Sequence, residues 1–383
     1  MYSFSYKVTK KKDFSIKNSQ KSPLYRKNNV SLHYNSTTNN ATTIHIYYFI
    51  YMMQLSIIVP IYNVEKYILL SIESIYKQGL DEESFEVILV NDGSTDKSME
   101  VIADFILQHK NIHVINQVNQ GLSVARNNGI AQAKGEYILM PDPDDLLIEN
   151  SLSKLLDLAI KNQADLVVAD FLEMHDEEIN QYNKNKVILQ KPFTMQIKTG
   201  EELFLQDLNP YQCYVWRTLF RRSFLLENNL SFEPGIFYQD IPFTHECYLK
   251  ANKCLRVSIL LNIYRLQRTG AATASFSKKK AKDYCIVIGK TWKLTYLPGI
   301  SHAALNKIKD DMYITFSLFI YSILHSLKTP SDQLEIIRFL KEMAPDIQFT
   351  NGKKQRFESF LLRNYPSLYL KIRRLHWVWN HYF

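Results

Sequence analysis

The feature that most limits the fold of this chain is a regular alternation of short apolar runs and helical segments between residues 54 and 169. Apolar runs predict strands at residues 54–59, 86–90, 112–115, 136–140 and 165–169. Helical spacing predicts helices at residues 64–78, 94–109, 121–134 and 149–162. Strands and helices that alternate at this spacing are typical of a mainly parallel sheet with right-handed crossovers. The sequence therefore predicts an α/β fold.

Polar residues recur where the predicted strands end. Tyr62 and Asn63 follow the first strand, which we expect Pro60 to end, and Asn91 and Asp92 follow the second. Acidic residues follow the fourth strand. Because parallel sheets bind ligands at the carboxyl ends of their strands, we expect these side chains to gather at one ligand-binding edge.

The acidic loop Asp142-Pro143-Asp144-Asp145 is the most distinctive of these segments. Two carboxylates one residue apart can hold Mg²⁺ or Mn²⁺ and leave coordination positions open for phosphate oxygens. The alternative is an acidic turn that caps the helix starting near Glu149. The chain has no Gly-x-Gly-x-x-Gly after the first strand and no P-loop sequence, which disfavours a dehydrogenase or a P-loop hydrolase. Without such a loop, bound phosphates need another counter-charge, and a metal on the acidic loop supplies it.

Four blocks of sequence, in matching order and spacing, resemble family 2 glycosyltransferases. They are residues 56–63, 90–96, 121–127 and 142–145. The resemblance implies a GT-A nucleotide-diphospho-sugar transferase fold with flanking helices and transfer with inversion at the anomeric carbon. It points to the bacterial polysaccharide type of these enzymes.

The resemblance also assigns residues to the donor site. It implies that Asp92 holds the nucleoside base, that Pro60 and Tyr62 line the same pocket, and that Glu65 approaches the ribose or base. Arg126, before the acidic loop, is implied to bind the donor as well, with a surface salt bridge or a helix cap as the alternative.

The metal and the diphosphate are assigned in the same way. Asp142 and Asp144 are implied to be the Asp-x-Asp pair, whose divalent Mn or Mg ion bridges the donor diphosphate. Asp145 either supports this pair or caps the following helix. Arg268 falls in a basic segment that resembles the one closing over the diphosphate in relatives.

Weaker similarity extends into the acceptor half. Trp216 begins a segment that resembles the acceptor-binding side of bacterial polysaccharide members, and Asp240 falls at the position of the general base. Inversion needs one carboxylate that takes the proton of the acceptor hydroxyl. The alternative for Asp240 is an N-cap of the helix running to Lys250. Gln239 stands where the family usually has Glu, so we expect it to position groups or contact the acceptor.

Charge and cysteine content exclude other classes. The net charge of +8 divides into +7 over residues 1–52, +6 over residues 351–383 and −5 over the rest, so a nucleic-acid-binding core is not expected. The four cysteines show no metal-ligand spacing and are expected to be buried, reduced thiols of a cytosolic protein. The polar and basic start of the chain carries no secretory signal, which favours the cytoplasm.

The chain is expected to divide into three parts. Residues 1–52 are rich in Lys, Asn, Ser and Thr, which predicts disorder over 1–46 or a start-site artefact upstream of Met52 and Met53. Residues 53–275 are the expected GT-A catalytic domain, with a donor half (53–165) and an acceptor half (166–275). Residues 276–383 are the expected helical C-terminal region.

The end of this region is expected to be a basic amphipathic helix. Its apolar residues recur at steps of four and three and form one helical stripe, which comprises Leu368, Ile372, Leu375, Trp379 and Tyr382. Such a helix can lie on an anionic membrane, and the alternative is a helix packed on the catalytic domain with its charges solvated. The uncharged run 312–327 is too short to span a bilayer.

The sequence therefore predicts an inverting, metal-dependent, hexosyltransferase-like enzyme. The expected donor is a nucleotide-diphospho-sugar, and the expected acceptor is a saccharide or lipid-linked saccharide of surface polysaccharide synthesis. The expected location is the cytoplasm or the inner face of the cytoplasmic membrane. The alternatives are a sugar nucleotidyltransferase and a non-catalytic nucleotide-sugar-binding protein.

Overall fold

The structure of the chain is a computed structural model that describes residues 5–7, 43–45, 53–185, 192–210, 212–267 and 276–382. The chain divides into two compact units, Met1–Met52 and Met53–Phe383. In the first unit, β1 (Ser5–Lys7) pairs antiparallel with β2 (Thr43–His45), and neither strand is expected from the sequence. The disorder predicted for residues 1–46 otherwise falls outside the described residues.

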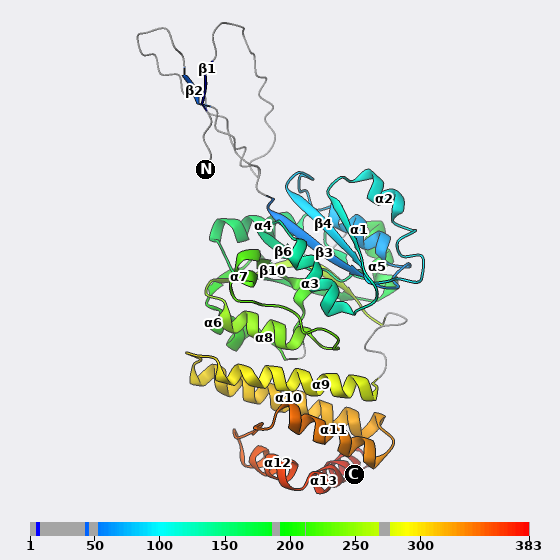
Figure 1. Ribbon diagram of the computed structural model, residues 1–383, viewed down its shortest axis with the longest axis vertical. Coiled ribbons are helices and arrows are strands. Elements are labelled where there is room, and N and C mark those ends of the chain that lie inside the picture. Colours follow the sequence, from blue (N-terminus) through cyan, green and yellow to red (C-terminus); the bar gives the residue numbers. More distant parts are fainter. Residues whose placement is uncertain are drawn as a thin grey trace. The chain divides into compact units, whose positions relative to one another are not determined.

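In the described part of the second unit, the strands form one nine-stranded sheet (Figure 1). Its strands run in the order β5-β4-β3-β6-β10-β8-β11-β7, and β9 also pairs with β11. The strands are β3 (Leu55–Ile61), β4 (Phe85–Asn91), β5 (Ile112–Asn116), β6 (Tyr137–Leu139), β7 (Leu146–Leu147), β8 (Leu166–Met174), β9 (Met195–Lys198), β10 (Thr218–Arg221) and β11 (Cys254–Arg265). The α/β class predicted from the sequence is confirmed.

The two halves of the sheet differ in strand direction. β3 pairs parallel with β4 and β6, and β4 pairs parallel with β5, as expected for successive βα units. β10 runs antiparallel to both of its neighbours, β6 and β8, and β11 pairs parallel with β8. Because of its direction, the start of β10, rather than its end, lies at the sheet edge where β6 and β8 end. The short 3₁₀ helix η1 (Val215–Arg217) before β10 therefore reaches the same edge as the acidic loop.

Helices cover both faces of the sheet. Alternate residues of β3 point to opposite faces, so Ile57 packs with the cluster under α1 and α4, whereas Ile58 packs with α3, α6 and α8. These helices are α1 (Ile68–Tyr76), α2 (Ala103–Gln108), α3 (Leu122–Gln132), α4 (Ser151–Asn162), α5 (Asp176–Asn185), α6 (Gly200–Asp207), α7 (Arg222–Glu227) and α8 (Asp240–Lys250). A side chain at Gly129 of α3 would clash with Ile58, so glycine here lets the helix lie close to the sheet.

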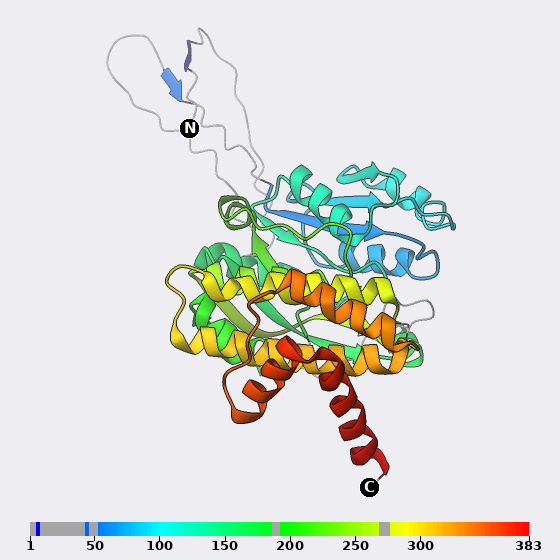
Figure 2. The ribbon, with the colours of Figure 1, turned by 60° about the horizontal axis from the view of Figure 1, so that its bottom comes forward.

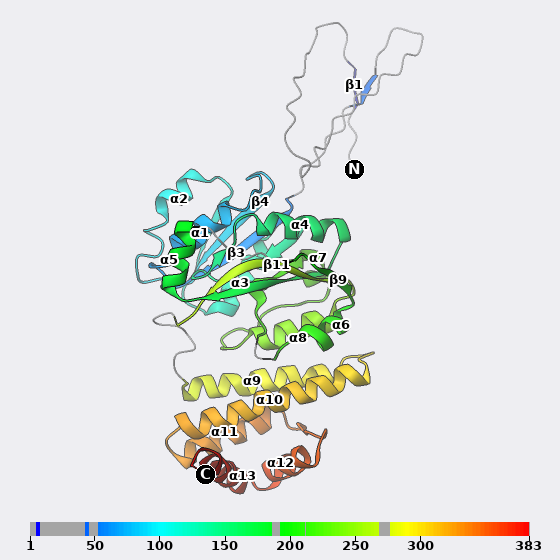
Figure 3. The ribbon, with the colours of Figure 1, turned by 180° about the vertical axis from the view of Figure 1, so that it is seen from behind.

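The predicted helical C-terminal region is confirmed. It consists of α9 (Lys278–Lys293), the 3₁₀ helix η2 (Leu294–Tyr296), α10 (His302–Ser326), α11 (Pro330–Met343), α12 (Lys353–Asn364) and α13 (Pro366–Tyr382). Helices α9, α10 and α11 form further layers beyond α8 (Figures 1 and 3). Among the described helices, none combines the length and the apolar character that crossing a membrane requires.

Two contacts tie these layers together. In the first, Nε2 of the buried His245 on α8 lies 3.9 Å from Oδ2 of Asp311 on α10. Burial lowers the pKa of His245 to about 4, so the ring is neutral at physiological pH. In the second, the ring of Tyr369 on α13 stacks on that of Phe316 on α10, with centroids 6.1 Å apart.

The structure corrects two local predictions and adds a strand. Pro60 lies inside β3, where it pairs with Val90 of β4. The pairing with β6 on the other side of β3 involves Leu55, Ser56 and Ile57 and does not reach Pro60. A residue without a backbone N–H is therefore tolerated at this end of the strand. The helix predicted for 94–109 begins only at Ala103. The two-residue strand β7, which is too short to have a pattern, was not predicted. The four cysteines are buried and free, as expected.

Candidate functional site

Two loops at the carboxyl end of β3 and β4 are joined by side-chain hydrogen bonds. Oδ1 of Asn63 accepts from the backbone N–H groups of Thr95 (2.8 Å) and Asp96 (3.3 Å). Oε2 of Glu65 accepts from the backbone N–H of Lys97 at 2.9 Å. These bonds hold residues 95–97 against the loop that follows β3. Glu65 therefore fixes the edge of the predicted donor pocket, and its contact with the ribose or base stays a prediction.

Asp92 organises the loop that leads into α3. Oδ1 of this buried carboxylate accepts from Nε2 of Gln117 (2.7 Å) and from the backbone N–H of Gln120 (2.8 Å). Oδ2 accepts from the backbone N–H of Gly121 at 2.8 Å. Gly121 has a φ of 88°, a conformation that favours glycine. Asp92 thus lies at the predicted nucleoside pocket with fixed orientation, and its bond to a base stays a prediction.

Tyr62 and Pro60 differ in their exposure. Tyr62 is 48% exposed just beyond β3, whereas Pro60 is buried within the strand. The exposed ring can cover a flat base, while Pro60 can contribute only to the wall behind it.

The acidic loop gathers three carboxylates at the end of β6. Asp142 is partly exposed, and its Oδ1 accepts from Nη2 of Arg126 at 2.6 Å. Asp145 is almost fully buried, and its Oδ1 accepts from the backbone N–H of Arg265 at 2.9 Å. Burial, followed by the charges of Asp144 and Asp142, raises the pKa of Asp145 well above its usual value. The three carboxylates therefore create an excess of negative charge at this edge.

The alternative of a helix cap does not describe these acids. The residue that precedes α4 is Asn150, which makes no side-chain capping bond, and β7 separates the acidic loop from the helix. Asp145 instead joins the loop to the end of β11 through Arg265.

Arg265 is a site residue that the sequence analysis missed. Besides the backbone bond to Asp145, its Nε donates to the carbonyl of Asp144 at 2.9 Å, and its Nη1 pairs with Asp176. Its guanidinium also lies 4.7 Å from the centre of the Tyr67 ring. These contacts fix the backbone of the acidic loop. No motif indicates them, because Arg265 is 120 residues from Asp145.

The acidic loop fits a divalent cation that also binds a diphosphate. Hard cations prefer carboxylate oxygens, and the crowded charges that raise the pKa of Asp145 would be relieved by a cation. Within the described residues, no group of three or more His, Cys, Asp or Glu side chains is arranged to hold a metal alone. That Asp142 and Asp144 hold the ion stays a prediction.

Arg126 is buried between the acidic loop and the acceptor half. It is 2% exposed, and its guanidinium lies 5.3 Å from the centre of the Phe232 ring. The side-chain amide of the next residue, Asn127, donates from Nδ2 to the carbonyl of Phe232 (2.8 Å) and accepts at Oδ1 from the backbone N–H of Phe232 (2.9 Å). The alternative of a surface salt bridge or cap is wrong for Arg126, since its partner Asp142 is reached from the interior. An interior cation can still attract a diphosphate bound at Asp142.

Asp240 begins α8 near these two residues. Burial raises its pKa to about 6, the charge of Arg126 opposes this shift, and the charge of Asp142 adds to it. Asp240, Arg126 and Asp142 therefore form one electrostatic group, although they are far apart in the sequence. Asp240 as a residue is partly exposed to solvent. The N-cap position is occupied by Gln239, so the capping alternative for Asp240 is wrong.

The turn before Asp240 has an unusual backbone. Tyr238 has a φ of 60°, a conformation that costs free energy for a residue other than glycine. Gln239 is 5% exposed, and its buried Oε1 has no hydrogen-bond partner. Its burial limits direct contact with an acceptor and favours the positioning role.

Three stacked aromatic rings lie beside the carboxylates. Trp216 is 3% exposed and lies against Tyr214 (centroids 4.8 Å apart) and Tyr264 (5.6 Å). Burial, Tyr214 and the three acids of the loop raise the pKa of Tyr264 to about 12. Because Trp216 is buried, the partly exposed Tyr214 and Tyr264 are better placed to meet an acceptor. Sequence reasoning missed both, and Arg268 lies outside the described residues.

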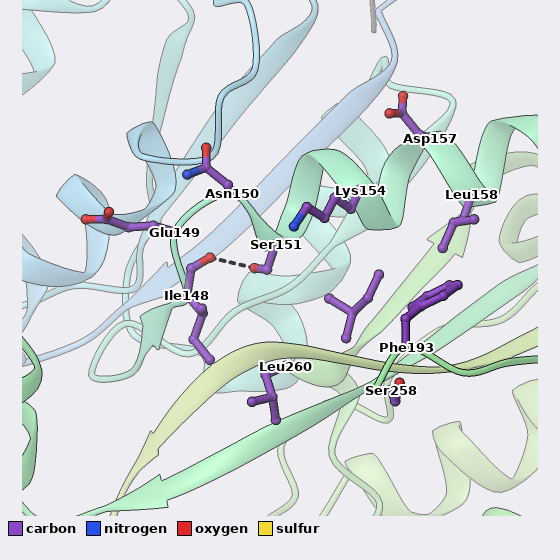
Figure 4. A pocket seen from close by; sticks show the side chains of 11 residues that line it. Ile148, Glu149, Asn150, Ser151, Lys154, Asp157, Leu158, Phe193, Ser258 and Leu260 are labelled. Atoms are coloured by element: carbon purple, nitrogen blue, oxygen red, sulfur yellow. Dashed lines mark hydrogen bonds between the residues drawn. The ribbon is translucent and has the colours of Figure 1, made fainter. Parts of the chain in front are cut away.

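A groove of about 510 Å³ opens elsewhere, between the start of α4 and β11 (Figure 4). Figure 4 shows the side chains of Leu158 and Phe193 pointing toward each other. Ser151 at its wall donates to the carbonyl of Ile148 at 2.6 Å. None of the predicted site residues lines this groove, so it has no part in the site described above.

Comparison with known proteins gives consistent results. A profile described as "Glycosyl transferase family 2" matches residues 56–226. The uncharacterized glycosyltransferase EpsJ of Bacillus subtilis is 37% identical over 215 residues, which cover 55% of this chain and 60% of EpsJ. The glycosyltransferase GlyG of Streptococcus pneumoniae is 29% identical over 316 residues, which cover 78% of this chain and 98% of GlyG.

The fold is also shared with a solved structure. TarS of S. aureus (residues 1–349), crystallised in complex with UDP-GlcNAc, superimposes with a TM-score of 0.68 and 19% identity, covering 86% of this chain and 93% of that chain. This likeness identifies the fold as GT-A. The profile runs from β3 to α7 and thus includes the loops that carry Asp92, Arg126 and the acidic residues, so this part of the chain is similar to glycosyl transferase family 2.

Proposed function

We propose that this protein is an inverting, metal-dependent glycosyltransferase that uses a nucleotide-diphospho-sugar donor. The observation that carries the proposal is the meeting of Asp142, Arg126 and Asp240 in one electrostatic group. A diphosphate site beside a carboxylate with a raised pKa is what a single-displacement transfer requires. The UDP-GlcNAc bound by TarS supports a donor of this class.

In the proposed reaction, Asp240 takes the proton of the acceptor hydroxyl as its oxygen attacks the anomeric carbon. A pKa of about 6 keeps this carboxylate ionised at neutral pH and still basic enough to accept a proton. The nucleoside diphosphate leaves on the opposite side of the sugar. Arg126 and the backbone of the acidic loop, held by Arg265, keep Asp142 and Asp144 in place. The divalent ion, when bound, would neutralise the charge that develops on the leaving diphosphate.

We further propose that the acceptor is a saccharide or a lipid-linked saccharide of a surface polysaccharide. Tyr214 and Tyr264 present apolar ring faces with hydroxyl groups beside the carboxylates, which suits a sugar that is apolar on one face and polar at its rim. An acceptor on a lipid would place the enzyme at the inner face of the cytoplasmic membrane.

A donor panel tests this proposal. The purified chain is incubated with nucleotide-diphospho-sugars and Mn²⁺ or Mg²⁺, and the released products are identified. A glycosyltransferase releases a nucleoside diphosphate. Release of pyrophosphate from a sugar phosphate and a nucleoside triphosphate would instead identify a sugar nucleotidyltransferase, and donor binding without any turnover would identify a binding protein. The segment Pro60-Ile61-Tyr62-Asn63 after β3, in place of a glycine- and lysine-rich loop, favours the first outcome.

A further inference from the structure

The last two helices carry an exposed row of apolar side chains, which we call the C-terminal apolar stripe. It consists of Phe357, Phe360, Tyr365, Leu368, Ile372 and Leu375, whose exposed fractions range from 37% to 69%. The rings of Phe360 and Tyr365 contact each other, with centroids 5.9 Å apart. From Tyr365 the row continues at steps of three and four residues, so it follows one side of α13. The row is therefore continuous across both helices.

The stripe is not needed to hold α13 in place. A different side of α13 makes the contacts with the protein, where Tyr369 and Leu370 are buried. On that side Nη1 of Arg373 lies 3.3 Å from Glu358 of α12, and Nη2 of Arg374 donates to Gln333 of α11 at 3.0 Å. The sequence left two alternatives for α13, a helix packed on the protein and a helix with an exposed apolar surface. The structure shows both on different sides of the same helix. Figure 2 shows α13 extending from the other helices toward its C-terminal end.

The segment that carries the stripe is strongly basic. Residues 351–383 contain seven Lys or Arg residues and a single acid, Glu358. Because Glu358 is buried and paired with Arg373, it does not offset the exposed cations. Exposed cations beside the stripe are Lys353, Lys354, Arg356, Arg363 and Lys371. On α12, Lys353, Arg356 and Arg363 share the helix side of Phe357 and Phe360 by their spacing.

We propose that the C-terminal apolar stripe binds the surface of an anionic phospholipid bilayer, with α12 and α13 lying at the interface. Aromatic rings and aliphatic side chains enter the boundary between head groups and acyl chains, while the flanking Lys and Arg residues meet lipid phosphates. A second copy of the chain is a poorer partner, because a symmetric interface would bring the like charges of both copies together. Nucleic acid is also a poorer partner, since Leu368, Ile372 and Leu375 offer no ring for base stacking.

Vesicle flotation of the full chain tests this inference. The wild-type protein should float with vesicles that contain phosphatidylglycerol and not with pure phosphatidylcholine vesicles, and high salt should weaken the binding. The double substitution Phe360→Ser with Leu375→Ser should weaken binding at least about tenfold, because two side chains no longer leave water. Leu107→Ser on α2 is the matched control, since Leu107 is 83% exposed and lies outside the stripe.

Thermal unfolding and donor binding should be the same for all variants, because the substituted residues lie outside the site. Equal flotation of the double variant and the wild type would overturn the inference, as would equal binding to neutral vesicles. A dimer in light scattering that the double variant loses, or a nucleic-acid complex in a gel-shift assay without vesicle binding, would assign the stripe to another partner. Vesicle binding requires no transfer reaction, so this test is independent of the proposed function.

Discussion

Nη2 of Arg126 lies 2.6 Å from Oδ1 of Asp142, and it reaches this carboxylate from inside the protein. The same guanidinium lowers the pKa of Asp240 and lies against the ring of Phe232. One buried cation thus acts on the predicted metal ligand and on the predicted base. The charge states of these two carboxylates are therefore coupled through Arg126.

Substitution of Arg126 should change the pH dependence of the reaction. Arg126→Met removes the charge that opposes the raised pKa of Asp240, so the acidic limb of the rate profile should move to higher pH. It should also lower the free energy of unfolding by about 2 kcal/mol, because a charged hydrogen bond is lost. Arg126→Lys keeps the charge and should restore the limb. If initial rates show the same acidic limb of the pH–rate profile in Arg126→Met and the wild type, Arg126 does not control the pKa of Asp240.

Asp240→Asn should abolish transfer while donor binding survives. The amide keeps the shape of the side chain and cannot accept the proton, so the rate should fall about 10²- to 10⁴-fold. Donor affinity, measured by calorimetry, should stay within about twofold, since Asp240 faces the acceptor in our assignment. The matched control is Asp104→Asn at the exposed start of α2. Equal rates in the two variants would show that another residue is the base.

The wild-type rate should rise with pH through an apparent pKa of about 6 and then level off, because the base must be ionised. The effect on stability has the opposite sign. Since the folded-state pKa of Asp240 exceeds its ordinary value of 3.8, ionisation between these values destabilises the fold. Asp240→Asn should therefore be more stable than the wild type above pH 6 and equal to it below about pH 4. Urea denaturation at both pH values measures the difference.

Metal dependence should require Asp144. Chelation by EDTA should stop transfer, and Mn²⁺ or Mg²⁺ should restore it. Asp144→Asn should weaken Mn²⁺ binding at least about tenfold in the presence of a nucleoside diphosphate, because a charged ligand is lost. Paramagnetic resonance of free Mn²⁺ gives the affinity directly, with Asp104→Asn as the control. Transfer that persists at full rate in EDTA would remove the metal from the proposal.

Arg265 should affect metal binding without touching the ion. Arg265→Gln removes the bond to the carbonyl of Asp144 and the pair with Asp176, but it keeps the backbone bond to Asp145. Looser positioning of the acidic loop should reduce Mn²⁺ affinity about tenfold. Arg256→Gln is a suitable control, since Arg256 lies on the same strand and pairs with Asp170. Similar Mn²⁺ affinities in both variants would show that Arg265 has only a structural role.

The parallel half of the fold could be predicted from local pattern. β3 and β4 are buried apolar runs with parallel neighbours, so their composition alone indicates strands. The helix predicted from residue 94 was too long, since α2 begins at Ala103, and residues 95 and 96 are instead held by Asn63 of another loop. Such a contact between two loops is not visible in the local sequence.

The site was predictable where a carboxylate follows a strand. Asp142 and Asp144 are of this kind, and the order of the strands brings them to the sheet edge that was expected. Arg265 and Tyr264 belong to the segment that was expected to close over the diphosphate, but their contacts were not predictable, because the pairing of β11 with β7 and β8 sets their positions. Burial also determines how a residue can act. The pattern could not show that Trp216 is covered by Tyr214 and Tyr264.

The contacts between α8, α10 and α13 have a consequence for the choice of acceptor. Tyr369 packs on Phe316 of α10, and Asp311 of the same helix faces His245, five residues after Asp240. If α13 rests on a bilayer, packed helices rather than a flexible linker set the height of Asp240 above the lipid head groups. We then expect the length of the carrier-linked glycan, and not only its terminal sugar, to determine which acceptor hydroxyl reaches the base.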